Sequence, residues 1–102
     1  MKARDLVIEV VEVRGECPVF KVGDRIVLRD GYRLDMDGTD ALCSHAMGSL
    51  LPFLSPISRG IDPVSLGLSQ EDGCGYVHCP DPGPPRTGGG TVVFRISPGG
   101  RV

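Results

Sequence analysis

Glycine and proline are spread through the whole chain, and they supply 15 and 9 of its 102 residues. Both residue types interrupt regular elements, because glycine has excess backbone freedom and proline lacks an amide donor. Uninterrupted long helices therefore have little room to form, which argues against a helical bundle. The composition instead predicts a single small domain over residues 1–102, with many turns around a modest core.

The segments between these turns carry patterns typical of strands. Residues 5–14 are rich in β-branched residues and alternate near their end, which predicts a first strand. Residues 25–34 predict two short strands joined by a turn at Asp30-Gly31, a dipeptide typical of hairpins. Residues 91–96 predict a last strand, and its buried face should carry Val92, Phe94 and Ile96.

One segment has helical periodicity instead. Thr39 or Asp40 is expected to cap its N-terminus, and Pro52 is expected to end or kink it. Ser55-Pro56 should open one further helical turn, which Gly60 closes. The apolar stripe that defines the helix consists of Leu42, Cys43, Ala46, Met47, Leu50 and Leu51.

The order of these elements is strand, hairpin, helix, loop, strand. This order predicts an α+β fold, in which one principal helix covers a small mixed or antiparallel sheet. A Gly/Pro-rich loop should precede the last strand. Residues 73–85, with the sequence GCGYVHCPDPGPP, are expected to be a solvent-facing, turn-rich part of that loop.

The cysteines are the residues most informative about function. The chain has four, and no pair is spaced as C-x-x-C, so the common zinc-ribbon and thioredoxin signatures are absent. Cys17 follows the first strand, Cys43 lies in the first turn of the helix, and Cys79 shortly precedes the last strand. If the first and last strands are neighbours in the sheet, these thiols converge at one end of it.

Three converging thiols predict a metal site. A helix N-terminus stabilises a thiolate at Cys43, and Cys-Pro occurs at both Cys17 and Cys79, as it does at the end of some iron–sulfur ligand runs. Three soft ligands bind a zinc ion, or three irons of a four-iron cluster, and leave one coordination position open. The expected metal ligands are therefore Cys17, Cys43 and Cys79, and the expected cofactor is an iron–sulfur cluster or zinc.

Two other interpretations stay open. Free cysteines often pack as small hydrophobic residues, so the chain could be a metal-free binding or interaction module with structural cysteines. It could also be a thiol enzyme with Cys43 as nucleophile, although no histidine is well placed as its base. His45 is expected to point into solvent, and His78 is a surface residue or an alternative ligand. Cys74 is expected to be incidental, and the alternatives are a fourth ligand, a resolving thiol or, in an oxidising compartment, a disulfide partner of Cys79. Whether the protein is an enzyme is left undecided, and catalytic residues are unknown.

Charge and hydropathy exclude some partners. The net charge is −2 and the isoelectric point is about 5.6, so no nucleic-acid footprint is expected. No apolar run reaches the roughly 18 residues of a membrane-spanning helix. Acidic residues interrupt the N-terminal apolar stretch, which argues against a signal peptide and predicts a cytoplasmic protein with reduced thiols. The sequence indicates no particular small-molecule partner, protein partner or oligomeric state.

Several short motifs together resemble a known family. They are Gly15-Glu16-Cys17-Pro18, Val22-Gly23-Asp24, a cysteine at the helix start (Cys43) and Cys79-Pro80-Asp81-Pro82. This combination is similar to a family of small uncharacterised prokaryotic proteins, known only as an uncharacterised repeat protein and found largely in anaerobes. The chain differs at Ser44, where that family often has proline. The resemblance supports a pattern of three cysteines, and an anaerobic context would favour an iron–sulfur cluster over zinc.

Overall fold

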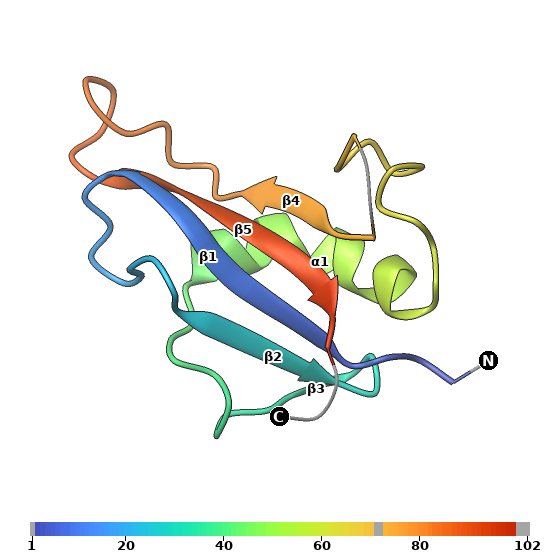
Figure 1. Cartoon of the computed structure of the whole chain (residues 1–102). Helices are drawn as coiled ribbons and strands as arrows, with labels where there is room; N and C mark the ends of the chain where they lie inside the picture. Colours follow the sequence, from blue (N-terminus) through green and yellow to red (C-terminus); the bar gives the residue numbers. More distant parts are fainter. Residues whose placement is uncertain (1, 71–72, 100–102) are drawn as a thin grey trace.

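The computed structural model describes residues 2–70 and 73–99, and in this part of the chain one helix packs on one face of a five-stranded sheet (Figure 1). The helix is α1 (Ser44–Ser58). The strands lie in the order β3-β2-β1-β5-β4, and every neighbouring pair is antiparallel. Their bounds are β1 Leu6–Gly15, β2 Arg25–Arg29, β3 Arg33–Leu34, β4 Gly75–His78 and β5 Gly90–Pro98. The α+β prediction is confirmed, and the sheet is antiparallel.

The first and last strands form the centre of the sheet. β1 pairs with β5 along its whole length, from Leu6 opposite Pro98 to Gly15 opposite Gly90. A β-bulge between Val10 and Glu12 shifts the register by one residue. This pairing brings the end of β1 and the start of β5 to the same end of the sheet.

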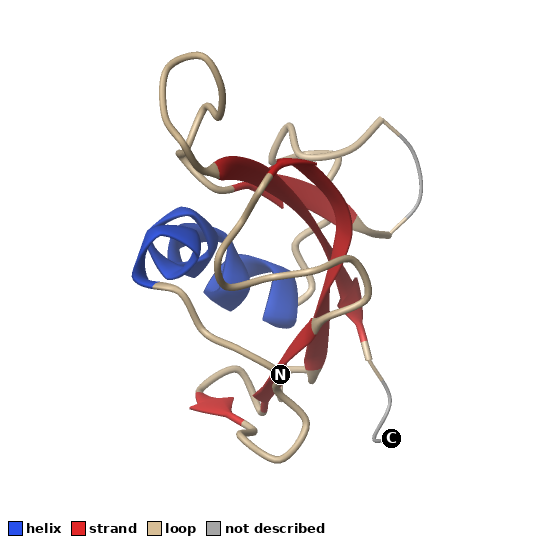
Figure 2. Ribbon diagram, turned by 90° about the vertical axis from the view of Figure 1, so that its left-hand side faces the viewer, coloured by secondary structure: helices blue, strands red, loops and turns tan. Residues whose placement is uncertain are grey.

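The core lies between α1 and one face of the sheet, as the edge-on view in Figure 2 shows. Alternate residues of the strands and residues about one helical turn apart on α1 meet there. Leu42 and Leu51, expected in the buried stripe of the helix, are instead 38% and 58% exposed. Buried residues of this core include Leu6, Ile8, Val10, Ile26, Leu28, Ala46, Leu50, Leu54, Ile57, Val92, Phe94 and Ile96.

The helix begins later than the sequence predicted. Neither Thr39 nor Asp40 caps it, because α1 starts at Ser44. The Thr39 hydroxyl accepts a hydrogen bond from Val27 N at 3.1 Å, and the Asp40 carboxylate accepts one from Arg25 N at 2.8 Å. These side chains therefore satisfy amides of β2, in place of the helix N-terminus.

The helix also continues past the expected stop. Pro52 and Pro56 both lie inside α1, which runs on to Ser58. A proline inside a helix costs about 3 kcal/mol, whereas burying one large apolar side chain contributes about 1.5–3 kcal/mol. Leu54 and Ile57 lie beyond Pro52 and are 4% and 0% exposed, so their burial offsets much of the proline penalty.

Gly60 terminates α1 itself, where a separate short turn was expected. It has a φ of +92°, and its N–H donates to Ile57 O at 3.1 Å. Ile61 N donates to Pro56 O at 3.0 Å, which completes a Schellman motif. Within the described residues, no helix has the length and apolar character needed to cross a bilayer.

The segment expected to be a solvent-facing loop contains a strand. β4 pairs with β5 and places Val77 opposite Phe94, so Val77 is buried against the core. The prediction was wrong here because this four-residue strand lies between glycine- and proline-rich turns. The Gly/Pro-rich loop predicted before the last strand is present, and it follows β4.

Candidate functional site

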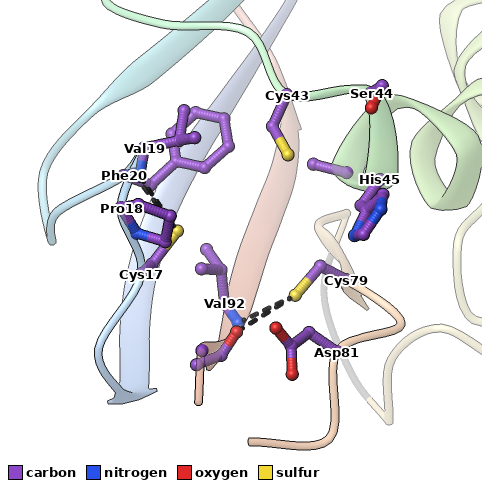
Figure 3. Close-up of a pocket in the computed structure, with 13 residues that line it drawn as sticks. Cys17, Pro18, Val19, Phe20, Cys43, Ser44, His45, Cys79, Asp81 and Val92 are labelled. Carbon is purple, nitrogen blue, oxygen red and sulfur yellow. Dashed lines mark hydrogen bonds between the residues drawn. The ribbon is translucent and has the colours of Figure 1, made fainter. Parts of the chain in front are cut away.

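A pocket lies at the end of the sheet where β1 and β4 finish and β5 begins (Figure 3). Its volume is about 260 Å³, several times the roughly 30 Å³ that one water molecule occupies in the liquid. The lining residues come from the β1–β2 loop, the start of α1, the segment after β4 and the start of β5. We call this space the cysteine pocket.

Cys17, Cys43 and Cys79 all line the cysteine pocket, and Figure 3 shows their sulfur atoms on three different sides of it. None of these three thiols is in a disulfide. The antiparallel pairing of β1 with β5, and of β5 with β4, is what gathers segments that are far apart in the sequence. Cys74 does not line the pocket.

Cys17 is fixed by the turn that follows it. Its Sγ accepts hydrogen bonds from Val19 N at 3.4 Å and from Phe20 N at 3.3 Å. Pro18 restricts the backbone directly after the cysteine, which favours a tight turn. Phe20 anchors the turn on the core by packing edge-on against Phe94, with ring centroids 5.2 Å apart. Backbone amides aimed at Cys17 stabilise negative charge on its sulfur.

Cys79 is held by β5. Its side chain is 6% exposed, and its N–H extends the β4–β5 ladder by donating to Val92 O at 3.0 Å. In return, Val92 N donates to Cys79 Sγ at 3.3 Å, and the sulfur lies 3.6 Å from Gly90 O. Main chain and side chain are both tied to the same strand, so this thiol has a well-defined position.

Cys43 is the N-cap residue of α1, and so it precedes the first turn in which it was predicted to lie. Its backbone is extended, with φ −132° and ψ 132°, and its side chain makes no capping hydrogen bond. The first turn of α1 has no acidic residue. The positive end of the helix therefore faces the pocket without a carboxylate on its own first turn to neutralise it.

Asp81 lines the cysteine pocket from the loop after β4. Its Oδ1 accepts hydrogen bonds from the Thr87 hydroxyl and from Gly83 N, the latter at 2.9 Å. These two bonds, and the nearby charge of His45, hold the pKa of the Asp81 carboxyl below its ordinary value. The Asp81 side chain therefore shapes the turn after β4. A side chain at Gly89 would collide with the Asp81 carboxylate, so only glycine fits there.

His45 was expected to point away from the cysteines into solvent. Its side chain is exposed, but it lines the cysteine pocket, and Figure 3 shows its imidazole between Cys43 and Asp81. The expected solvent exposure is confirmed. The contact with the pocket was not predicted, because Cys43 was expected to be helical, whereas its backbone is extended and α1 begins at Ser44. His78 is exposed and does not line the pocket, and its Nδ1 lies 2.6 Å from Cys79 O.

The side chains of the pocket do not form a compact site for one metal ion. Among residues 2–70 and 73–99, no three His, Cys, Asp or Glu side chains are grouped closely enough to hold one. A site for a single ion therefore needs movement of at least one of these side chains.

Comparison of the chain with protein-family models, curated proteins and solved structures found no match. Functional inference therefore starts from the residues of the cysteine pocket.

Proposed function

We propose that the cysteine pocket binds a four-iron iron–sulfur cluster through Cys17, Cys43 and Cys79. The observation that carries this proposal is that three thiols from three distant segments line one pocket of about 260 Å³. Each thiolate would bind a different iron, which leaves one iron without a cysteine ligand. When bound, such a cluster supplies one-electron transfer and a position for a further ligand.

The hydrogen bonds to sulfur support this proposal. Cluster thiolates carry negative charge, and N–H donors to sulfur help to set the reduction potential. Backbone amides of Val19, Phe20 and Val92 donate to Cys17 and Cys79. Cys43 lies at the positive end of α1. Backbone N–H donors therefore reach two of the three sulfur atoms, and the N-terminus of α1 lies beside the third.

A single zinc ion is the less favoured cofactor. Tetrahedral zinc with bonds of about 2.3 Å would hold its thiolates roughly 3.5 to 4 Å apart. No three ligand groups in the described residues are grouped for one ion, whereas a cluster holds its thiolates farther apart because each binds a different iron. The proposed membership of a family found largely in anaerobes also favours a cluster. A reducing cytoplasm, which keeps such thiols unpaired, is the compartment that this proposal requires.

A metal-free binding module is the second candidate. Cys79 is 6% exposed and belongs to the hydrophobic core, and Cys17 and Cys43 pack against that core. Buried thiols of this kind also occur as simple packing residues. In that case the pocket would take an uncharged small molecule or stay filled with water.

Anaerobic reconstitution with ferrous iron and sulfide separates the two candidates. The cluster proposal predicts a brown protein with about four irons per chain and broad visible absorption. Alanine substitution of Cys17, Cys43 or Cys79 should remove most of the bound iron. The matched control is Cys74→Ala, which changes a cysteine outside the pocket and should bind iron like the wild type. A folded, colourless, iron-free wild-type protein would exclude the cluster and leave the binding module.

A further inference from the structure

Two side chains of the cysteine pocket other than the thiols can bind iron. They are the imidazole of His45, in the first turn of α1, and the carboxylate of Asp81, in the loop after β4. Figure 3 shows both on the side of the pocket where Cys79 lies. An iron without a cysteine ligand would therefore have a nitrogen donor and an oxygen donor nearby.

The hydrogen bonds of Asp81 make its carboxylate less available as an iron ligand than the imidazole of His45. Oδ1 of Asp81 is occupied by Gly83 N and the Thr87 hydroxyl, and Asp81 O accepts a bond from the Thr91 hydroxyl at 2.6 Å. The carboxylate also abuts Gly89. Asp81 is thus committed to holding its loop together. The exposed imidazole of His45 can instead turn about its side-chain torsions.

We propose that His45 ligates the iron that the three cysteines leave without a thiolate, and that Asp81 orients its ring. This inference rests on the proposed cluster. One ring nitrogen gives its lone pair to iron, and neither partner changes oxidation state. A histidine that binds a metal usually donates its other ring N–H to a carboxylate or carbonyl, and the Asp81 carboxylate lines the same side of the pocket as His45 (Figure 3). Histidine ligation of iron–sulfur clusters is known to raise their reduction potential.

This ligand set assigns the cluster to electron transfer. With all four irons held by the protein, no coordination position is left for a substrate. The imidazole is neutral where a fourth thiolate would be anionic, so less negative charge opposes reduction. This role could not be predicted from the sequence, because the helix was expected to start before Cys43, whereas it begins at Ser44 with His45 in the pocket lining.

The test is pulsed electron paramagnetic resonance on the reconstituted, reduced full-length protein. Cells are grown with ¹⁵N-labelled histidine, so that coupling from a bound imidazole is distinguished from coupling through backbone amides. We expect strong histidine nitrogen coupling in the wild type and in His78→Ala, the matched control at the other histidine. His45→Cys should keep the cluster, lose that coupling and have a lower reduction potential, because a thiolate replaces the imidazole.

The outcomes separate this inference from the proposed function. A wild-type cluster without histidine nitrogen coupling overturns the role of His45 and leaves three-cysteine binding intact. Coupling that persists in His45→Cys also overturns it. A wild-type protein that takes up no iron overturns the cluster, and the histidine ligand falls with it. His45→Cys retains four ligands, so the comparison does not depend on a variant with a weakened site.

Discussion

At the scale of single residues, Asp24 shows how the loop that carries Cys17 is anchored. Its side chain is 5% exposed, and its carboxylate accepts hydrogen bonds from Lys21 Nζ at 2.8 Å and Lys21 N at 3.0 Å. Its main chain is tied to β1, since Val10 N donates to Asp24 O at 2.8 Å. The carboxylate of the Val22-Gly23-Asp24 motif is therefore buried and paired with Lys21.

These contacts make the protein sensitive to acid at Asp24. The Lys21 side-chain bond, followed by the Lys21 amide bond, lowers the pKa of Asp24 below its ordinary value of 3.8. The resulting stabilisation is present above about pH 4 and is lost as the pH falls through the lower folded-state pKa. We expect Asp24→Asn to lower the free energy of unfolding by roughly 1–3 kcal/mol at neutral pH. Urea titrations at falling pH should show this difference shrinking, and a constant difference would contradict the assignment.

At the scale of elements, α1 shows that apolar periodicity predicts the presence of a helix better than its ends. The apolar periodicity correctly indicated a helix near residues 42–51, but both of its ends were misplaced. The start was wrong because Thr39 and Asp40 have partners on β2, and the end because burial of Leu54 and Ile57 offsets much of the proline penalty. Gly60 was correctly expected to close a helical turn, because a glycine after a helical segment is a local signal for a helix end. In the structure it has a φ of +92°.

Two glycine substitutions test the end and the interior of α1. Gly60 has a φ of +92°, where an alanine side chain is strained, so Gly60→Ala should lower the free energy of unfolding by about 1 kcal/mol or more. Gly48 lies inside α1, and a side chain there would meet no heavy atom within 4 Å. Gly48→Ala should therefore stabilise the protein by about 0.5–1 kcal/mol. Denaturant unfolding of both variants gives the comparison, and equal effects of the same sign would contradict it.

At the scale of the whole molecule, the cysteine pocket depends on the pairing of the two ends of the chain. Gly90 begins β5 opposite Gly15, the last residue of β1. A side chain at Gly90 would approach Arg14 O to 2.7 Å and Glu16 N to 2.9 Å. The end of β1 and the start of β5 therefore lie too close together for a side chain between them. This close approach sets Cys17 and Cys79 on opposite sides of one space.

Adding a side chain where Gly90 contacts the end of β1 should therefore lower both the stability of the protein and its iron binding. We expect Gly90→Ala to lower the free energy of unfolding by about 1–3 kcal/mol and to reduce the iron retained after reconstitution. Gly88→Ala is the control, because a side chain at Gly88 meets no heavy atom within 4 Å. Thermal unfolding and iron content are measured on both variants. Unchanged iron content in a destabilised Gly90→Ala protein would show that the junction does not shape the pocket.

Local signals in the sequence were sufficient for several features of this protein. Alternating β-branched residues predicted β1 and β5, and Asp30-Gly31 predicted the β2–β3 hairpin, where both residues have positive φ. The choice of Cys17, Cys43 and Cys79 as a group followed from their places next to elements, once β1 and β5 were assumed to be neighbours. Each of these features depends on residues close together in the chain, or on one assumption about strand order.

Only the tertiary structure decided the rest. β4 exists because β5 offers it a hydrogen-bonding edge and the core offers Val77 a buried position. Cys79 is buried by the same pairing, and His45 reaches the pocket because α1 begins one residue after Cys43. These outcomes come from contacts between residues far apart in sequence, whose energies outweigh local preferences for turns and helix ends. Local sequence patterns determined β1, β2, β3, β5 and the presence of α1, and packing between distant segments determined β4 and what lines the pocket.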